Sequence, residues 1–144
     1  MARGTVEAIC ISDTKGVKKN RIEAGYLIEG HGLEHDAHAQ AWHRQVSLLA
    51  KESIKKMQDA GSDVVSGDFG ENIVTSGLEL TKLSPGTKIY IGDKVILKVT
   101  QIGKTCHERC AIYYQAGDCI MPSEGIFGEV LQGGTAKVGD FIEV

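Results

Sequence analysis

Residues 89–102 read IYIGDKVILKVTQI, and this stretch decides the fold class. In its second half, apolar side chains recur at every second position: Val95, Leu97 and Val99. This period of two is typical of a β-strand with one buried face. A shorter apolar run precedes that strand, and the pair Gly92-Asp93 separates the two, as expected of a tight turn. The stretch therefore predicts a β-hairpin or a sharp β-corner.

The rest of the chain continues this pattern of short segments. The 144 residues include 18 glycines and only two prolines, and segments of about ten residues between turn signals are typical of a β-sandwich or barrel. Further strands are predicted at Val6–Ile11, Tyr26–Glu29, Ile73–Thr75, Gly128–Leu131 and Phe141–Val144. Apolar residues at helical spacing predict a helix in VSLLAKESIKKMQDAG, residues 46–61, and a shorter helix is predicted from His107 to Gln115. We expect one mostly β domain, residues 1–144, with one or two helices.

Composition excludes several classes of protein. The net charge is −3 and the Lys and Arg residues are scattered, so we expect no nucleic-acid partner. The N-terminal residues MARGTVEAICISDTKG hold no apolar run long enough for a signal peptide or a membrane span. We therefore expect a cytoplasmic protein without a membrane anchor. Disulfides rarely persist in the cytoplasm, so the cysteines are expected to be free thiols, metal ligands or a reactive thiolate.

Three of the four cysteines lie in TCHERCAIYYQAGDCIMP, residues 105–122. Cys106 stands at a predicted strand-to-helix junction, where the helix N-terminus and the cations Lys104 and Arg109 favour a thiolate. Cys106 is therefore the candidate reactive cysteine. A structural zinc site on Cys106, Cys110 and Cys119 stays open as an alternative, because the first two have the spacing of zinc ligands. The fourth cysteine, Cys10, lies in an apolar run and is expected in the core.

Two other segments carry residues suited to binding. GHGLEHDAHAQAWHRQ, residues 30–45, holds four histidines, most of which are expected to be solvated. Arg44 and Gln45 end this segment at the predicted helix entrance, where a guanidinium and backbone N–H groups form an anion cradle. In SGDFGENIV, residues 66–74, glycines allow the backbone to bend and to approach a ligand closely.

These segments, in this order, resemble the MOSC domain, which is named after the C-terminal domain of molybdenum cofactor sulfurases. The resemblance covers nearly the whole chain and rests on DAHA at 36–39, RQVSL at 44–48, GDFGENI at 67–73, IGD at 91–93, Cys106 after a VTQ strand, and GIFGEV at 125–130. It implies a MOSC-type β-barrel and a role around the molybdenum cofactor, molybdopterin. In that role Cys106 would carry sulfur or coordinate molybdenum as its metal ligand.

The resemblance also implies residues that bind the cofactor: His38, Arg44, Gln45, Gly70, Glu71, Asn72, Lys104 and Arg109. Many family members have proline just before the cysteine, where this chain has Thr105. We expect no pyridoxal-phosphate site within the chain, and none of the extra β domain of larger relatives that reduce N-hydroxylated compounds. The expected partners are therefore a sulfur donor, an electron-donor protein or a molybdenum-cofactor enzyme. A zinc-stabilised binding module and a non-catalytic partner of cofactor-biosynthesis enzymes stay open as alternatives.

Overall fold

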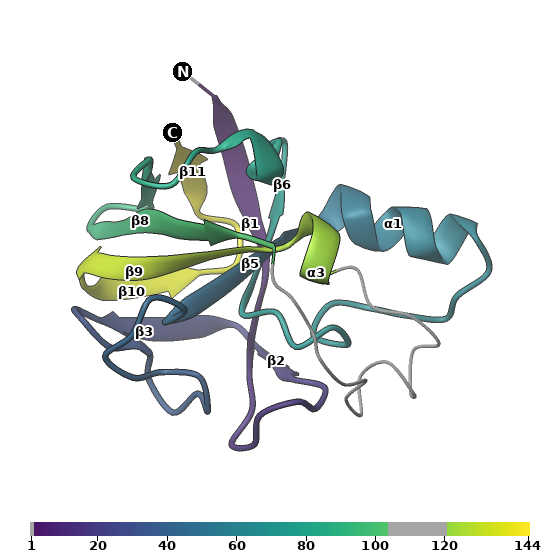
Figure 1. Cartoon of the computed structure of the whole chain (residues 1–144), viewed down its shortest axis with the longest axis horizontal. Coiled ribbons are helices and arrows are strands. Elements are labelled where there is room, and N and C mark those ends of the chain that lie inside the picture. The colour runs from purple at the N-terminus through teal and green to yellow at the C-terminus, as the bar shows by residue number, and fades with distance from the viewer. Residues whose placement is uncertain (1, 104–120) are drawn as a thin grey trace.

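The computed structural model of the chain describes residues 2–103 and 121–144, and strands make up most of its regular secondary structure (Figure 1). The elements in chain order are β1 (Arg3–Ile11), β2 (Asn20–Ile22), β3 (Ala24–Ile28), β4 (Gly32–Leu33), β5 (Val46–Ala50), α1 (Lys51–Asp59), β6 (Ile73–Ser76), the 3-10 helix η1 (Leu80–Lys82), β7 (Lys88–Ile91), β8 (Val95–Ile102), α3 (Met121–Glu124), β9 (Ile126–Gln132), β10 (Gly134–Lys137) and β11 (Phe141–Glu143). The predicted mostly β fold is confirmed.

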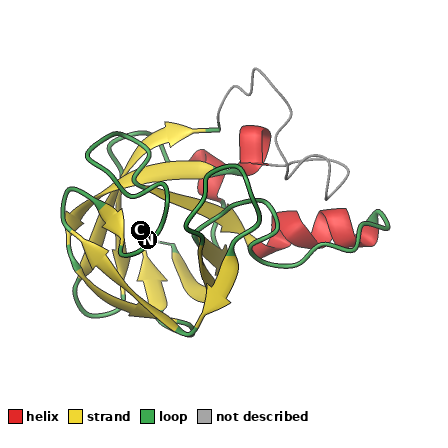
Figure 2. Cartoon of the chain, turned by 90° about the horizontal axis from the view of Figure 1, so that it is seen from below, coloured by secondary structure: helices red, strands yellow, loops and turns green. Residues whose placement is uncertain are grey.

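Seven strands close into a barrel. Their order is β11-β7-β8-β9-β5-β6-β1, and β1 pairs again with β11, with Gly4 opposite Ile142. This last pairing joins the two edges of the sheet, which removes the exposed edges that an open sheet would leave. Strand β2 extends β1 beyond the barrel, and β10, β3 and β4 form a separate three-stranded sheet. Figure 2 shows the strands curving around the barrel, with the helical segments outside it on one side.

The strand predictions from sequence are largely confirmed. Strands β7 and β8 form the predicted hairpin, with Ile91 opposite Val95 across a glycine at φ 59°. The alternating side chains of β8 point into the barrel, where they join a core of aliphatic residues from nearly every strand. The five other predicted strands overlap β1, β3, β6, β9 and β11. The short strands β2, β4 and β10 were not predicted, and the predicted helix from His107 to Gln115 lies outside the described residues.

The predicted helix over residues 46–61 is wrong in its first five residues. Residues 46–50 form β5, and the helix α1 begins only at Lys51. All five side chains of β5 are buried, because one face lines the barrel while Leu49 packs outside it, in a second apolar cluster with Ile54 of α1. A strand buried on both faces is a continuous apolar run, which periodicity alone does not separate from a helix. Arg44 and Gln45 therefore precede a strand and not a helix N-terminus.

Two glycines with the same backbone conformation provide a matched test of packing. Gly61 follows the end of α1 and Gly67 lies in the loop before β6, both at φ 96°. A Cβ atom at Gly61 would meet nothing within 4 Å, whereas one at Gly67 would collide with the carbonyl oxygen of Lys19. We predict that Gly61→Ala lowers the free energy of unfolding by about 1–2 kcal/mol, the strain of a left-handed alanine. Gly67→Ala should lower it further, because the backbone must shift.

Urea unfolding followed by circular dichroism measures both variants. Equal losses of stability in the two variants would contradict the close approach of Gly67 to the loop that holds Lys19.

Candidate functional site

Polar residues gather on the outside of the barrel, where β1 ends and β5 and β6 begin. Strands β5 and β6 are parallel, with Leu48 opposite Ile73, and β1 runs antiparallel to β6. The end of β1 therefore meets the starts of the other two strands. The start of β9 is also close, because Phe127 lies opposite Ser47. This arrangement brings together the segments from 36–47 and 67–72, which lie on either side of α1 in the sequence.

The side chain of Asn72 joins these strands. Its Oδ1 atom accepts hydrogen bonds from the backbone N–H and the hydroxyl of Ser47, at 3.0 and 3.1 Å. Its Nδ2 atom donates to the carbonyl oxygen of Cys10 at 3.1 Å, and its backbone N–H also contacts the Ser47 hydroxyl. Asn72 has no exposed surface. Both ends of its amide are therefore used to connect β1, β5 and the loop before β6.

Glu71 closes the loop before β6. Its two carboxylate oxygens accept hydrogen bonds from the backbone N–H groups of Gly67 and Phe69, at 2.9 and 3.1 Å. The side chain is fully buried, and this burial raises the pKa of Glu71 from 4.5 to about 7, against the two backbone hydrogen bonds, which lower it. Gly70, at φ 78°, allows the turn that brings the carboxylate back over its own loop.

A buried ion pair anchors the neighbouring segment. Lys19 and Asp36 have fully buried side chains, with Nζ and Oδ1 2.7 Å apart. The Lys19 ammonium also lies 3.1 Å from the Ser12 hydroxyl and 3.1 Å from Nδ1 of His38. Burial alone would raise the pKa of Asp36, but the hydrogen bond and charge of Lys19 outweigh it and hold this pKa below its ordinary value. The pair therefore holds His38 against β1 and the loop that follows it.

Arg44 lies between two aromatic rings. Its guanidinium carbon is 4.6 Å from the centre of the Trp42 ring and 5.6 Å from that of Phe127. The indole N–H of Trp42 donates to the carbonyl oxygen of His38 at 2.8 Å, which fixes the first ring. The Nε atom of Arg44 is buried and has no hydrogen-bond partner in the part of the chain that the structure describes. Since buried donors are normally satisfied, an unpaired N–H at this position is unusual.

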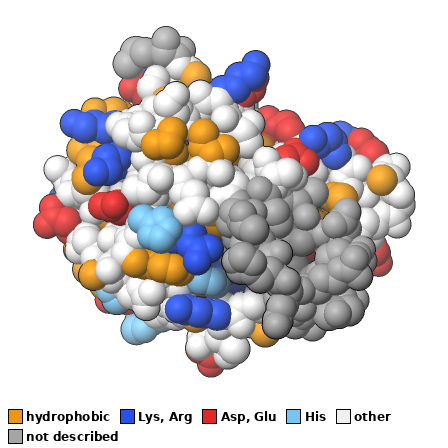
Figure 3. All heavy atoms as spheres, viewed as in Figure 1, with side chains coloured by type: hydrophobic (Ala, Val, Ile, Leu, Met, Phe, Trp, Pro, Cys, Tyr) orange, Lys and Arg blue, Asp and Glu red, His pale blue; other side chains and the backbone are white. Residues whose placement is uncertain are grey.

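The predicted site residues divide into three groups. His38 and Arg44 meet around Trp42. Figure 3 shows histidine and basic side chains gathered on the lower left of the face that it draws. Gln45, Gly70, Glu71 and Asn72 are buried. The three side chains among them are bonded inside the protein; Gln45, for example, accepts from the backbone N–H of Val130 at 2.9 Å. A third group lies outside the described residues: Lys104, Cys106 and Arg109, with Cys110 and Cys119 of the zinc alternative.

Sequence reasoning missed Lys19, and it gave Trp42 no role. The segment KGVKKN resembles a solvated basic loop, so nothing in it distinguishes Lys19 from its neighbours. Trp42 did carry a signal, because it is the only tryptophan in the chain and stands two residues before Arg44. Cys10 is buried in the core as expected, and burial is the main cause that raises the pKa of its thiol to about 12. Cys10 is therefore an unreactive thiol.

Residues 2–103 and 121–144 hold neither a metal-binding cluster nor a membrane-spanning helix. These residues contain no group of three or more His, Cys, Asp or Glu side chains placed to hold a metal ion. They also contain no helix with the length and apolar character needed to cross a membrane.

Glu71 gives the loop a distinctive dependence on pH. Because its pKa is raised to about 7 in the folded protein, folding favours the protonated acid. Its contribution to stability is therefore complete below about pH 4.5 and is lost as the pH rises to 7. We predict that the free energy of unfolding falls over this interval, and that Glu71→Gln removes most of this fall. Denaturant unfolding at a series of pH values measures the free energy of unfolding. The control is Glu23→Gln at an exposed position, which should keep the pH dependence of the parent protein.

Comparisons with known proteins agree with this architecture. The structure of the YuaD protein from Bacillus subtilis matches with a TM-score of 0.80 and 19% identity, covering 97% of this chain and 94% of that one. YiiM from Geobacillus stearothermophilus matches with a TM-score of 0.72 and 19% identity, covering 98% of this chain and 75% of that one. YiiM from Escherichia coli matches with a TM-score of 0.67 and 18% identity, covering 99% of this chain and 69% of that one. At these identities the likeness shows the fold alone.

No curated protein sequence matches the chain. Residues 35–143 match the family profile of the MOSC domain, a range that includes β5, the loop that holds Glu71, and every later strand. Since this range is well over half of the 144 residues, the chain belongs to the MOSC domain family.

Proposed function

We propose that this protein binds the molybdenum cofactor, molybdopterin, at the surface around Arg44, with Cys106 as the sulfur carrier or molybdenum ligand. The observation that carries the proposal is the Arg44 guanidinium, held between two rings with a buried and unpartnered N–H. Membership of the MOSC family supports the choice of cofactor over other anionic ligands. When bound, the cofactor would supply molybdenum for redox chemistry or a centre that accepts sulfur.

The chemistry of Arg44 suits an anionic group such as a phosphate. A guanidinium is always charged and presents its donors in a planar fork that matches phosphate oxygens. Contact with Trp42 and Phe127 restricts the Arg44 side chain before a ligand arrives, so less side-chain entropy remains to be lost on binding. The ammonium of Lys15 lies 5.2 Å from the centre of the Trp42 ring and adds a second positive charge beside that ring.

The buried network beneath Arg44 would act as its support. Asn72 and Ser47 fix the start of β5, and Lys19 and Asp36 fix the segment that carries His38 and Trp42. We propose that Gln45, Glu71 and Asn72 contribute to cofactor binding by positioning these segments. His38, with 29% of its side chain exposed, and Arg44 would be the ones that touch the ligand.

The end of β8 supports a role for Cys106 beside this surface. The hydroxyl of Thr100 donates to the carbonyl oxygen of His43, the residue before Arg44. Three residues further on, the backbone N–H of Gly103 donates to the carbonyl oxygen of Gly125 at 2.7 Å. Cys106 follows Gly103 by three residues, a chain length that spans at most about 11 Å. A thiolate is a soft ligand that suits such a metal, and we propose that Lys104 and Arg109 favour its charged form.

A carrier of sulfur must receive it, and a molybdenum centre that reduces a substrate must receive electrons. We therefore propose that this protein works with a sulfur-donor protein, an electron-donor protein or a molybdenum-cofactor enzyme. The alternatives from the sequence, a zinc-stabilised module and a non-catalytic scaffold, stay open, and the three cysteines of the zinc site lie outside the described residues.

Replacement of Arg44 tests the cofactor site. We predict that Arg44→Gln lowers the affinity for molybdopterin by about 10- to 100-fold, the effect of losing charge-assisted hydrogen bonds worth about 1.5–3 kcal/mol. The measurement is the amount of pterin retained after purification, read by the fluorescence of its oxidised form. Arg21→Gln, which removes an exposed arginine on β2, is the matched control and should retain the parent amount. Equal retention by the two variants would refute the role of Arg44.

Replacement of Cys106 tests the sulfur or metal role. We predict that Cys106→Ser loses sulfane sulfur from the protein, or molybdenum from the bound cofactor, while Cys110→Ser keeps both. Mass spectrometry of the intact protein and elemental analysis measure the two quantities. If Cys106→Ser keeps as much molybdopterin, molybdenum and sulfane sulfur as the parent protein, this cysteine has neither role. Zinc present in equal molar amount, and lost from both variants, would favour the zinc-stabilised alternative.

A further inference from the structure

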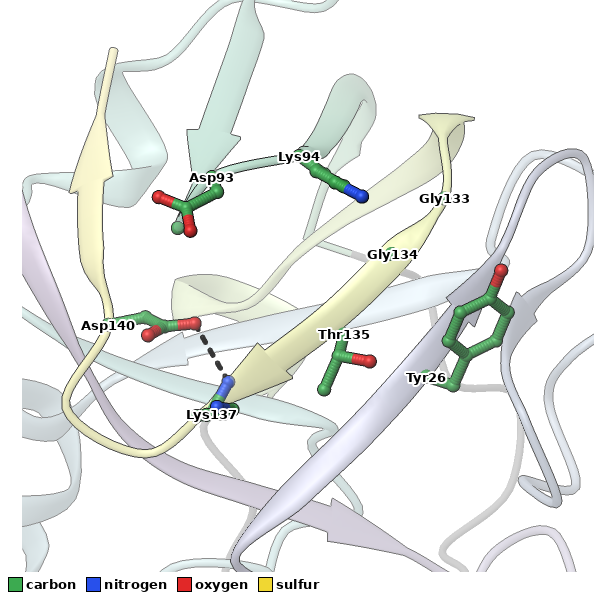
Figure 4. Close-up of a pocket in the computed structure, with 9 residues that line it drawn as sticks. Tyr26, Asp93, Lys94, Gly133, Gly134, Thr135, Lys137 and Asp140 are labelled. Atoms are coloured by element: carbon green, nitrogen blue, oxygen red, sulfur yellow. Dashed lines mark hydrogen bonds between the residues drawn. The ribbon is translucent and has the colours of Figure 1, made fainter.

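A cavity of about 490 Å³ lies at the other end of β8, away from Arg44 (Figure 4). The turn between β7 and β8, the start of β10, the turn before β11 and Tyr26 of β3 line it. Val95, beside this cavity, and Thr100, beside the Arg44 surface, are five residues apart on β8, or about 17 Å along an extended strand. The cavity is therefore separate from the site proposed for the cofactor.

The main chain of Thr135 faces away from its partner strand at this cavity. Strand β10 is an edge strand that pairs only with β3, and the backbone N–H of Val138 donates to the carbonyl oxygen of Glu23 on the β3 side. Alternate residues of an antiparallel strand face the same way, so Ala136 and Gly134 also face β3. Thr135 and Lys137 face the opposite side, where the cavity lies.

Only one residue of this edge is open. The backbone N–H of Lys137 donates to Oδ2 of Asp140 at 2.9 Å, which occupies one end. At the other end, a Cβ atom on Gly134 would be 3.0 Å from Cβ of Lys94, so the hairpin closes against β10 there. The N–H and C=O of Thr135 remain between these two contacts. An added β-strand needs several open residues, so this edge is too short for a peptide strand. It fits a ligand that has the main-chain groups of a single amino acid.

The side chains around the cavity carry both signs of charge. Figure 4 shows Asp93 and Asp140 on one side of the cavity, where Lys137 lies beside Asp140, and Lys94 and Tyr26 toward the other side. None of Asp93, Lys94 and Asp140 forms an ion pair with another described residue. Tyr26 has 49% of its surface exposed, which is high for a large aromatic residue. A purely anionic ligand would be repelled by the two carboxylates, whereas a ligand with both charges would satisfy both sides.

We propose that this cavity binds a free α-amino acid with a planar side chain. Its ammonium group would lie toward Asp93 and Asp140, and its carboxylate toward Lys94. The N–H and C=O of Thr135 would pair with the carboxylate and ammonium as a neighbouring strand would, and the planar side chain would pack on Tyr26. The volume lies within the usual range for sites that hold small molecules.

Isothermal titration calorimetry with L-phenylalanine tests the proposal on the full chain. We expect saturable binding, weakened about fivefold or more when either charge of the ligand is removed, in N-acetyl-L-phenylalanine and in L-phenylalaninamide. L-alanine, which keeps both charges but has no ring, should also bind more weakly. Absence of saturable binding at millimolar L-phenylalanine overturns the proposal, as does binding of either blocked analogue that is as tight as that of L-phenylalanine itself.

Variants then locate the bound amino acid. Asp93→Asn and Lys94→Met should each weaken L-phenylalanine binding about fivefold, and Lys88→Met, an exposed lysine on β7 outside the cavity, should leave it unchanged. Asp93 and Lys94 are exposed in a turn, so thermal unfolding should show the parent stability for both variants. Unchanged affinity in both variants would refute the site. Arg44→Gln should leave amino-acid binding intact, so the cofactor proposal and this one can fail separately.

Discussion

The buried amide of Asn72 is the constraint on which the candidate site depends. It bonds at once to Ser47 at the start of β5 and to Cys10 near the end of β1, two strands that are not neighbours in the barrel. Loss of one partner would leave a buried polar group unsatisfied, at about 1–3 kcal/mol. The amide therefore sets how the start of β5 lies against β1. It also fixes where the preceding residue, Glu71, turns back over its loop.

The surface around Arg44 follows from this fixed base. Because Ser47 lies opposite Phe127, any shift of β5 would move one of the two rings that enclose the guanidinium. The other ring, Trp42, is held through the carbonyl of His38, which in turn rests on the Lys19–Asp36 ion pair. The site is thus a set of short contacts between segments that are distant in sequence. Its precision comes from buried polar groups, which tolerate little displacement.

Much of the barrel was predictable from sequence because most strands have one buried face. Alternation in β8 and the turn at Gly92 predicted a hairpin or a sharp corner, and the structure has the hairpin. Strand β5 was taken for a helix, since it is buried on both faces and has no alternation. The family motif indicated Arg44, Glu71 and Asn72. It did not indicate which of them reach the surface, because a sequence motif does not show how deeply a side chain is buried. Lys19 was missed, since its pairing with Asp36 depends on a contact across 17 residues.

The pairing of β1 with β11 has a consequence for how the barrel forms. The contact joins Arg3 to Glu143 and Gly4 to Ile142, so it links the first and last strands of the barrel. A contact between residues so far apart in sequence has a high entropic cost of loop closure until the strands between them have paired. We expect closure to be a late and slow step in folding, preceded by a partly open sheet. During that interval the unpaired edges of β1 and β11 would be the segments most exposed to aggregation.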